Sequence, residues 1–349
     1  VDEEKVRVIG TLIGGGFGGK EDIVGQIHAV MLAQATGRPV KMLYDRQESL
    51  VVHPKRHATY LRVKLGFKND GTMIAAQTEL TGDTGAYASL GEKVLTRATT
   101  HSTGPYVIPH VKADCFAMYT NNPPAGAFRG FGVLQSAFAI ESAMDEVAEH
   151  FGMDPVELRR KNALRVGTFT NTGQYLTESV GLDECIDKVE AEMRRLAGDN
   201  DPFKPQIVEG HPNLKRAWGF AVAFKNTGLG GGAPDKATAQ VELYSDGTVE
   251  SRISSAELGQ GLVTVLQLIT AEELHLPVDK VHVLLSDTDL TPDGGPTTAS
   301  RQTYVSGNAV KHASAMMREA MASTLAETYD IAPEKVEFIE GLAQVGEKK

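Results

Sequence analysis

The spacing of hydrophobic residues predicts a mixture of helices and strands. Residues 6–13 (VRVIGTLI) form an apolar run typical of a buried strand, and the glycine-rich stretch 14–21 (GGGFGGKE) follows it. Residues 23–37 then have helical spacing and end at a glycine, while residues 39–45 (PVKMLYD) form a second short apolar run. The N-terminal part of the chain therefore predicts the order strand, glycine loop, helix, strand.

Two hairpins are predicted where alternating patterns flank a turn. YLRVKLGF and MIAAQTEL flank residues 69–71 (NDG), and ATAQVELY and TVESRISS flank residues 245–247 (SDG). After the second hairpin come the loop ELGQG, the helical pattern LVTVLQLITAEEL and the strand pattern VHVLLSD. This order resembles that of the first half only loosely, and no sequence repeat is evident.

Three more helices follow from the pattern. Apolar residues recur at three- and four-residue steps from Val133 to Phe151, which predicts one core-facing stripe. Asp154 is suited to cap a second helix that has Pro155 at its first position. Residues 305–326 are also helical in character. Together, these elements predict a mixed α/β fold.

Length and composition indicate two domains. The chain has 349 residues, of which 41% are hydrophobic, enough to form packed cores. Residues 197–212 are polar and contain prolines, which is typical of a domain boundary. We therefore expect a first domain over residues 1–200 and a second over residues 213–349.

Charge and cysteine usage exclude several classes of function. A net charge of -10 argues against binding to nucleic acid or to an anionic membrane. Cys115 and Cys185 stand apart, so they predict neither a disulfide framework nor an iron–sulfur or zinc site. No apolar run is long enough to span a membrane, and the acidic start VDEEKVRV is unlike a signal peptide. These features predict a cytoplasmic protein, and a start at Val1 predicts that the chain is part of a longer one.

The first glycine loop has three interpretations. Gly14, Gly16 and Gly19 satisfy GxGxxG, and Asp45 ends the next predicted strand, as in an NAD-binding dehydrogenase. The loop also satisfies GxxxxGK, but Glu21 stands where a P-loop needs Ser or Thr for magnesium. The simplest alternative is a tight strand-to-helix turn in which the glycines relieve steric conflict. The loop by itself leaves the first and third interpretations open.

Three further segments distinguish between these interpretations, because a dinucleotide fold gives no reason for them. They are AGAFRGFG at 125–132, AELGQG at 256–261 and PTTAS at 296–300. In order and spacing with GGGFGGKE, they resemble the molybdopterin subunit of xanthine dehydrogenases and aldehyde oxidases. The resemblance implies a two-domain molybdenum-binding subunit of a molybdenum hydroxylase.

The family's amino-terminal segment and its C-terminal general-base glutamate have no match here. That glutamate lies in a GE motif, and the GE pairs Gly91-Glu92 and Gly346-Glu347 lack its surroundings. We therefore expect a subunit truncated at both ends and inactive by itself. It would need the missing molybdenum-subunit segments, and iron–sulfur and FAD centres on partner subunits or domains.

The resemblance also implies the cofactor residues. Phe17 and Gly18 would approach the oxo face of the metal, and Arg129 would lie near the molybdenum centre. The cofactor would be molybdenum-molybdopterin, in its plain or cytosine dinucleotide form, and it brings its own dithiolene ligands. Hence no protein metal ligand is expected, and His53 and His57 are interpreted as loop histidines. The residues that would cradle the pterin and its phosphate or dinucleotide tail are Gly259, Gln260, Ala299, Ser300, Gln302 and Thr303.

Two charged residues bear on the substrate. Glu21 and Arg97 fall where purine-hydroxylating members carry the pair that holds and polarises the heterocycle, and Phe131 matches an aromatic residue that stacks on the ring. This predicts hydroxylation of xanthine or hypoxanthine with water as the oxygen source. Leu229 or a glycine replaces the second aromatic residue, so nicotinate, another N-heterocycle or an aldehyde stays an alternative. The simpler interpretation has Glu21 capping a helix and Arg97 in a surface pair.

Overall fold

The computed structural model describes residues 2–345, and contacts divide them into two compact units. The central unit comprises residues 17–225. The terminal unit comprises residues 2–16 together with residues 226–345. The chain therefore passes from one unit to the other inside the first glycine loop, between Gly16 and Phe17. The domain bounds expected from the sequence, 1–200 and 213–349, stay a prediction.

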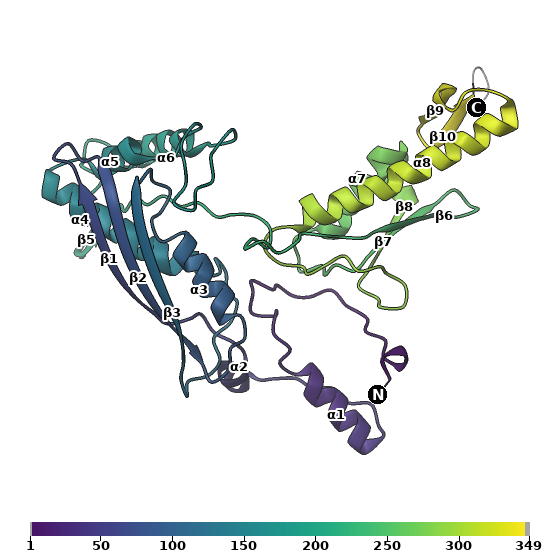
Figure 1. Ribbon diagram of the computed structural model, residues 1–349, viewed down its shortest axis with the longest axis horizontal. Coiled ribbons are helices and arrows are strands. Elements are labelled where there is room, and N and C mark those ends of the chain that lie inside the picture. Colours follow the sequence, from purple (N-terminus) through teal and green to yellow (C-terminus); the bar gives the residue numbers. More distant parts are fainter. Residues whose placement is uncertain (1, 346–349) are drawn as a thin grey trace. The chain divides into compact units, whose positions relative to one another are not determined.

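A three-stranded sheet forms the frame of the central unit (Figure 1). β1 and β2 form an antiparallel hairpin with Leu61 opposite Leu80, and β3 runs parallel to β2 with His110 opposite Ala75. Because parallel neighbours need a crossover connection, helix α3 links β2 to β3. These elements are β1 (Thr59–Phe67), β2 (Met73–Gly85), α3 (Gly91–Thr100) and β3 (His110–Tyr119).

Helices cover this sheet. α4 packs against β1 and α3, α5 packs against α4, and α6 packs against α5. Two further helices precede the sheet, and a small hairpin ends the unit. The elements are α1 (Gln26–Thr36), α2 (Arg46–Val52), α4 (Val133–Phe151), α5 (Pro155–Asn162), α6 (Leu182–Ala197), β4 (Gln206–Val208) and β5 (His211–Arg216).

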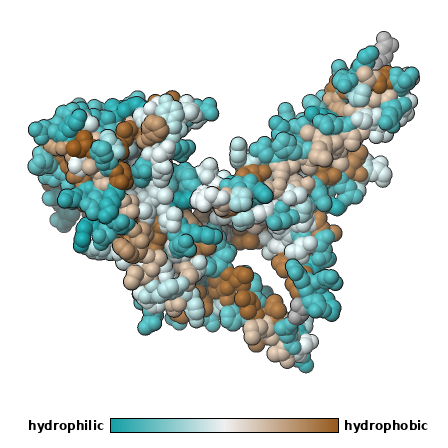
Figure 2. All heavy atoms as spheres, in the orientation of Figure 1, coloured by the Kyte–Doolittle hydropathy of each residue, from teal (hydrophilic) through white to brown (hydrophobic). Residues whose placement is uncertain are grey.

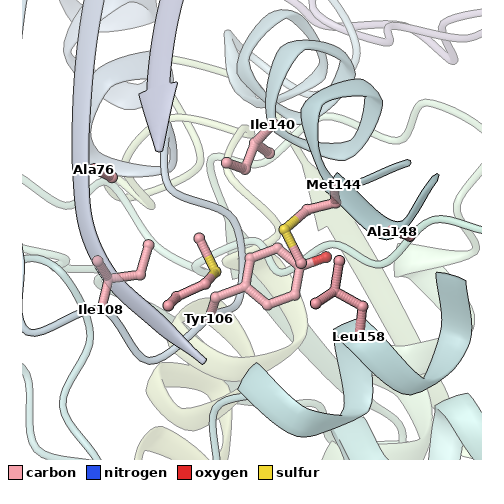
Figure 3. Packing of buried hydrophobic residues seen from close by; sticks show 8 residues of the cluster. Ala76, Tyr106, Ile108, Ile140, Met144, Ala148 and Leu158 are labelled. Carbon is pink, nitrogen blue, oxygen red and sulfur yellow. The ribbon is translucent and has the colours of Figure 1, made fainter. Parts of the chain in front are cut away.

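The core of the central unit lies between the sheet and α4. Figure 3 shows Tyr106 among Ile108, Ile140, Met144 and Leu158, all of them buried. Each such side chain contributes roughly 1.5–3 kcal/mol by leaving water. The tyrosine hydroxyl is satisfied because it donates to a carboxylate on α4. This packing fixes α4, and with it the loop from which α4 starts.

That carboxylate, Glu141, is the centre of a buried polar network. It accepts hydrogen bonds from Tyr106 Oη at 2.5 Å, Arg159 Nε at 2.7 Å and the Val222 backbone N–H at 3.0 Å. Arg159 is fully buried and also donates to the Glu141 carbonyl oxygen at 3.0 Å. The network therefore ties α4 and α5 to residues that lie far from them in sequence.

The terminal unit has the same succession of elements. Its sheet has the order β6-β7-β8, with an antiparallel hairpin, a crossover helix α7 and a parallel third strand, followed by the long helix α8 (Figure 1). A small hairpin, β9 and β10, ends the described chain. The elements are β6 (Gln240–Leu243), β7 (Val249–Ile253), α7 (Leu262–Leu274), β8 (Val281–Leu285), α8 (Gly307–Tyr329), β9 (Val336–Ile339) and β10 (Leu342–Val345). The two units therefore repeat one topology, which the sequence only loosely indicated.

Short helical segments complete the described chain. Residues Gln302–Ser306 form a π-helical turn that leads directly into α8. The remaining three are 3-10 turns: Glu3–Lys5, Val278–Lys280 and Pro333–Lys335.

The structure confirms both hairpins and the helices expected near residues 23–37, 133–151, 154–162, 262–274 and 305–326. The strand expected over residues 39–45 is wrong. Asp45 instead caps α2: it accepts from the Glu48 N–H, and its own N–H donates to the Glu48 side chain. The capping box therefore starts α2 at Arg46, and residues 39–44 form no strand.

The strand expected over residues 6–13 is also wrong, because its pairing is too short. Gly10 N–H donates to the Ser286 carbonyl and Thr288 N–H to the Val8 carbonyl, just beyond β8, leaving one isolated bridge between Ile9 and Asp287. The segment is thus held by a few bonds at the end of a strand and does not become a strand of the sheet. The strand–helix–strand unit required for NAD binding therefore does not form.

Helix α1 is apolar but has no buried residue. Figure 2 shows its hydrophobic side chains on the surface, and they include Ile27, Val30 and Met31. In residues 2–345, no helix is both long and apolar enough to cross a membrane.

Candidate functional site

The first glycine loop contributes to both units, so its two parts are described separately. Gly15, Phe17 and Gly18 have positive φ angles of 75°, 52° and 86°. Helix α1 begins only at Gln26, and its cap residue makes no side-chain capping bond. Glu21 therefore lies outside α1, and the N-cap position of this helix is Gly25.

In the central unit, the loop lies against the AFRGFG segment. A Cβ atom on Gly18 would lie 2.9 Å from the Ala127 carbonyl carbon and 3.0 Å from the Phe128 nitrogen. The Arg129 guanidinium lies 5.8 Å from the centre of the Phe17 ring. Two segments that the sequence singled out are thus brought together, and glycine is required at their contact.

The AFRGFG segment also lies against helix α3. Phe131 and Gly132 have φ angles of 49° and 96°, and a Cβ on Gly132 would collide with the Val94 carbonyl oxygen of that helix. Arg97 lies one turn further along α3. The segment that carries Arg129 and Phe131 is therefore held against the helix that carries Arg97.

Two residues that sequence reasoning missed hold these loops. Arg56 donates to the Arg129 carbonyl oxygen at 2.7 Å and lies 4.6 Å above the Phe128 ring. Asp22 accepts a hydrogen bond from Ser89 Oγ at 2.7 Å, just before α3. The only available signal for Asp22 was its position directly after Glu21. Arg56 had no signal in the sequence, because its partner is a backbone carbonyl.

Positive charge gathers around Arg97. Arg97 is half-buried, and burial lowers its pKa, which argues against the simpler interpretation as a solvated surface pair. Burial lowers the Lys225 pKa too, and the nearby Arg97 lowers it further. His101 stacks on Phe224 at 4.6 Å and donates from Nδ1 to the Arg97 carbonyl at 3.0 Å; burial lowers its pKa to about 4. This environment favours an anionic group.

In the terminal unit, the start of the glycine loop binds the ELGQG segment. Ile13 N–H donates to the Glu257 carbonyl at 2.9 Å, and Gly15 N–H donates to the Leu258 carbonyl at 3.1 Å. A Cβ on Gly16 would lie 3.0 Å from a methyl carbon of Leu258. The close backbone approach again depends on glycine.

The ELGQG and PTTAS segments meet through Gln302. Its amide oxygen accepts from Ser255 Oγ at 2.8 Å and Ser306 Oγ at 2.6 Å, and its amide nitrogen donates to Thr297 Oγ1 at 3.1 Å. Thr297 Oγ1 also accepts from Ala256 N–H at 2.9 Å. Both the oxygen and the nitrogen of the buried Gln302 amide therefore bind protein groups.

A third loop joins this cluster. Arg301 is fully buried and donates to Asp235 at 2.8 Å, while Gly228 N–H donates to the Ala299 carbonyl at 2.8 Å. These bonds hold the loop GLGGGAPD, with Leu229, beside PTTAS. Ala299 and Ser300 have positive φ angles of 52° and 56°. The surrounding contacts hold these two residues in a sparsely populated backbone conformation, as is common at functional sites.

The ELGQG loop leaves open space beside two of its glycines. Gly259 and Gly261 have φ angles of 96° and 79°, and no atom lies within 4 Å of a Cβ built on either, so the space above them is open. Within residues 2–345, no cluster of three His, Cys, Asp or Glu side chains could hold a metal. Of the two GE pairs, Glu92 is exposed at the start of α3, and Gly346-Glu347 lies outside the described residues.

Comparison with known proteins agrees with these features. Two family models described as "Molybdopterin cofactor-binding domain" match residues 1–163 and 195–349. The nicotinate dehydrogenase large molybdopterin subunit of Eubacterium barkeri is 48% identical over 194 residues, which is 56% of this chain and 46% of that protein. The xanthine dehydrogenase molybdenum-binding subunit of Escherichia coli O157:H7 is 34% identical over 326 residues, 90% of this chain and 41% of that protein.

A solved structure is also similar to this chain. Quinoline 2-oxidoreductase from Pseudomonas putida 86 matches 99% of this chain with a TM-score of 0.81 and 25% identity. The match covers 45% of the quinoline enzyme's chain. The matched parts of the chain thus cover less than half the length of each of these relatives.

Proposed function

Because the chain belongs to the molybdenum-cofactor-binding subunits of the xanthine dehydrogenase and aldehyde oxidoreductase family, we propose that it is part of an enzyme that hydroxylates a purine-like N-heterocycle such as xanthine or hypoxanthine. Water would be the oxygen source. The oxidising centre would be the molybdenum of the bound molybdopterin, in its plain or cytosine dinucleotide form.

One observation carries the proposal. In the central unit, the AFRGFG segment packs on the first glycine loop through Gly18 and on helix α3 through Gly132. The loop that carries Glu21, the helix that carries Arg97 and the segment that carries Arg129 and Phe131 therefore belong to one local assembly. A simple strand-to-helix turn gives no reason for this convergence.

Each residue has a role in this proposal. The Glu21 carboxylate binds a ring nitrogen or exocyclic oxygen of the heterocycle. The Arg97 guanidinium stabilises negative charge that develops on the ring, and its burial strengthens that effect. Phe131 stacks on the ring. Phe17, Gly18 and Arg129 would lie near the metal.

In the terminal unit, glycine-rich loops and hydroxyl groups hold the pterin. Gly259 and Gln260 are exposed, with open space at the Cβ position of Gly259, and Ser300 and Thr303 are exposed residues that carry hydroxyls. Ala299 lies beside them. Gln302 acts by joining the loops, because its amide binds protein groups. Iron–sulfur and FAD centres, and the remaining molybdenum-subunit segments, come from partner subunits or domains of a cytoplasmic enzyme.

Nicotinate is a second candidate substrate. The cations Arg97 and Lys225 lie close enough to affect each other electrostatically, and a carboxylate would be stabilised near both. The nicotinate dehydrogenase of Eubacterium barkeri is also similar to this chain at 48% identity over 194 residues. Leu229 or a neighbouring glycine stands where the resemblance to purine enzymes implies an aromatic residue.

The test is to co-express the parent reading frame with its neighbouring subunits. Molybdenum and pterin per protein are measured with turnover of xanthine, hypoxanthine and nicotinate, and with label from isotopic water in the product. We expect stoichiometric molybdenum and purine turnover that Glu21→Ala or Arg97→Ala abolishes, while Glu92→Ala, an exposed change on α3, leaves it intact. Turnover of nicotinate alone would change the substrate, and absence of molybdenum with tight NAD binding would contradict the proposal.

A further inference from the structure

The carboxylate of Glu257 occupies the backbone donors at the start of α7. One oxygen accepts from Gly259 N–H at 2.7 Å and Gly261 N–H at 3.1 Å, and the other accepts from Val263 N–H at 3.1 Å. A phosphate at a helix N-terminus would use these same groups. The anion position of α7 is therefore filled by a charge of the protein itself.

The rest of the loop is bonded internally as well. Gln260 accepts from Leu258 N–H at 2.6 Å and donates to the Ala256 carbonyl at 3.0 Å. Gly259 and Gly261 have positive φ angles, and glycine has no intrinsic preference for that region over others. The shape of the loop therefore depends on its hydrogen bonds, and Glu257 accepts three of them.

The Glu257 carboxylate is favoured in its ionised form in this position. Burial by itself would raise its pKa, but the backbone donors of Val263, Gly259 and Gly261 outweigh that effect and lower the pKa. A phosphate brought to the same donors would face an ionised carboxylate at close range, which is repulsive. The segment 299–303 offers a different environment, with exposed hydroxyls at Ser300 and Thr303.

We propose that Glu257 is a positioning residue of the pterin-binding site, which fixes the GQG loop before the cofactor arrives and excludes the cofactor's phosphate from the N-terminus of α7. The anionic tail is then bound at segment 299–303. This inference rests on the proposed function. A helix N-terminus commonly binds an anion, but this helix already has a carboxylate at its backbone donors.

The test uses Glu257→Ala and Glu257→Gln in the complete enzyme, with Glu272→Gln, an exposed change on the same helix, as the control. We expect about tenfold less molybdenum and pterin per protein in Glu257→Ala, an intermediate loss in Glu257→Gln, and no loss in the control. The second measurement is the Tm of cofactor-free enzyme, made in a host that cannot synthesise molybdopterin, with and without inorganic phosphate. Phosphate should raise the Tm of Glu257→Ala more than that of the unsubstituted enzyme, which a purely structural role would not cause.

Two results would overturn the inference. One is full cofactor content in both Glu257 variants, and the other is an equal phosphate effect on the Tm of the Glu257→Ala and unsubstituted enzymes. Failure of the proposed function is distinguishable from both, because it appears in the unsubstituted enzyme itself, either as absence of molybdopterin or as absence of purine turnover.

Discussion

Gly18 and Ala127 lie so close that a Cβ atom on the glycine would be 2.9 Å from the alanine carbonyl carbon. They come from two loops that are far apart in sequence, and Gly18 also has a φ of +86°, which disfavours any other residue. The contact joins the loop that carries Glu21 to the segment that carries Arg129. The arrangement of the candidate site thus depends on the absence of a Cβ atom at Gly18.

The first prediction concerns this contact. Gly18→Ala should cost roughly 1–3 kcal/mol from overpacking and about 1–2 kcal/mol from left-handed strain. Cofactor content should fall with it. The measurement is urea unfolding together with molybdenum per protein. Gly14→Ala is the matched control in the same loop, because no atom lies within 4 Å of its Cβ position. Equal free energies of unfolding for the two variants would contradict the close approach of Gly18 to Ala127.

Local signals made much of the fold predictable. The turns at 69–71 and 245–247 and the cap at Asp154 determine their elements within a few residues, so both hairpins and α5 match the expectation. The strand expected over 39–45 did not form, and Asp45 and Glu48 instead form a capping box that starts α2, a signal that was present in the sequence. The shared topology of the two units was not predictable from sequence similarity. Different side chains can pack the same arrangement of strands and helices, so no sequence repeat is needed.

The candidate site was predictable where it lies in glycine-rich motifs. Such motifs mark close backbone approach, and Gly18, Gly132 and Gly16 all have it. Arg56 was missed because it donates to a backbone carbonyl, and such a partner leaves no motif in the sequence. Glu257 was missed for the opposite reason. It lies inside a recognised motif, but only the hydrogen-bond geometry shows that its carboxylate takes the donors assigned to the cofactor.

The second prediction concerns the buried network of Glu141. Glu141→Ala removes the buried carboxylate and leaves Asp145 as the ion-pair partner of Arg159, so it should reduce the free energy of unfolding by about 3 kcal/mol. Glu146→Ala, an exposed change on the same helix, should change it by less than about 0.5 kcal/mol. Urea unfolding checks both values. A loss of similar size in the two variants would mean that the network does not stabilise the unit.

The third prediction is a pH dependence that arises from His101. Burial lowers its pKa from the ordinary 6.5 to about 4, so the unfolded chain binds a proton more readily than the folded chain between these values. His101 therefore favours folding above pH 6.5, and this contribution is lost as the pH falls from about 6.5 to 4. His101→Gln should flatten the fall in stability between pH 6.5 and pH 5, whereas His282→Gln, an exposed change, should not. Parallel curves for His101→Gln and the unsubstituted enzyme would contradict the assignment.

The fourth prediction separates an anionic from a neutral substrate. If Lys225 and Arg97 together favour a carboxylate, Lys225→Met should raise the inhibition or Michaelis constant of nicotinate about threefold, the size expected for a partly exposed ion pair. The constant for nicotinamide, which has the same ring without the charge, should stay the same. Lys225→Arg keeps the charge and should behave like the unsubstituted enzyme, as should Lys93→Met on the exposed side of α3. An equal change for both ligands would show that Lys225 affects the site without discriminating charge, and the purine assignment would then be favoured over nicotinate.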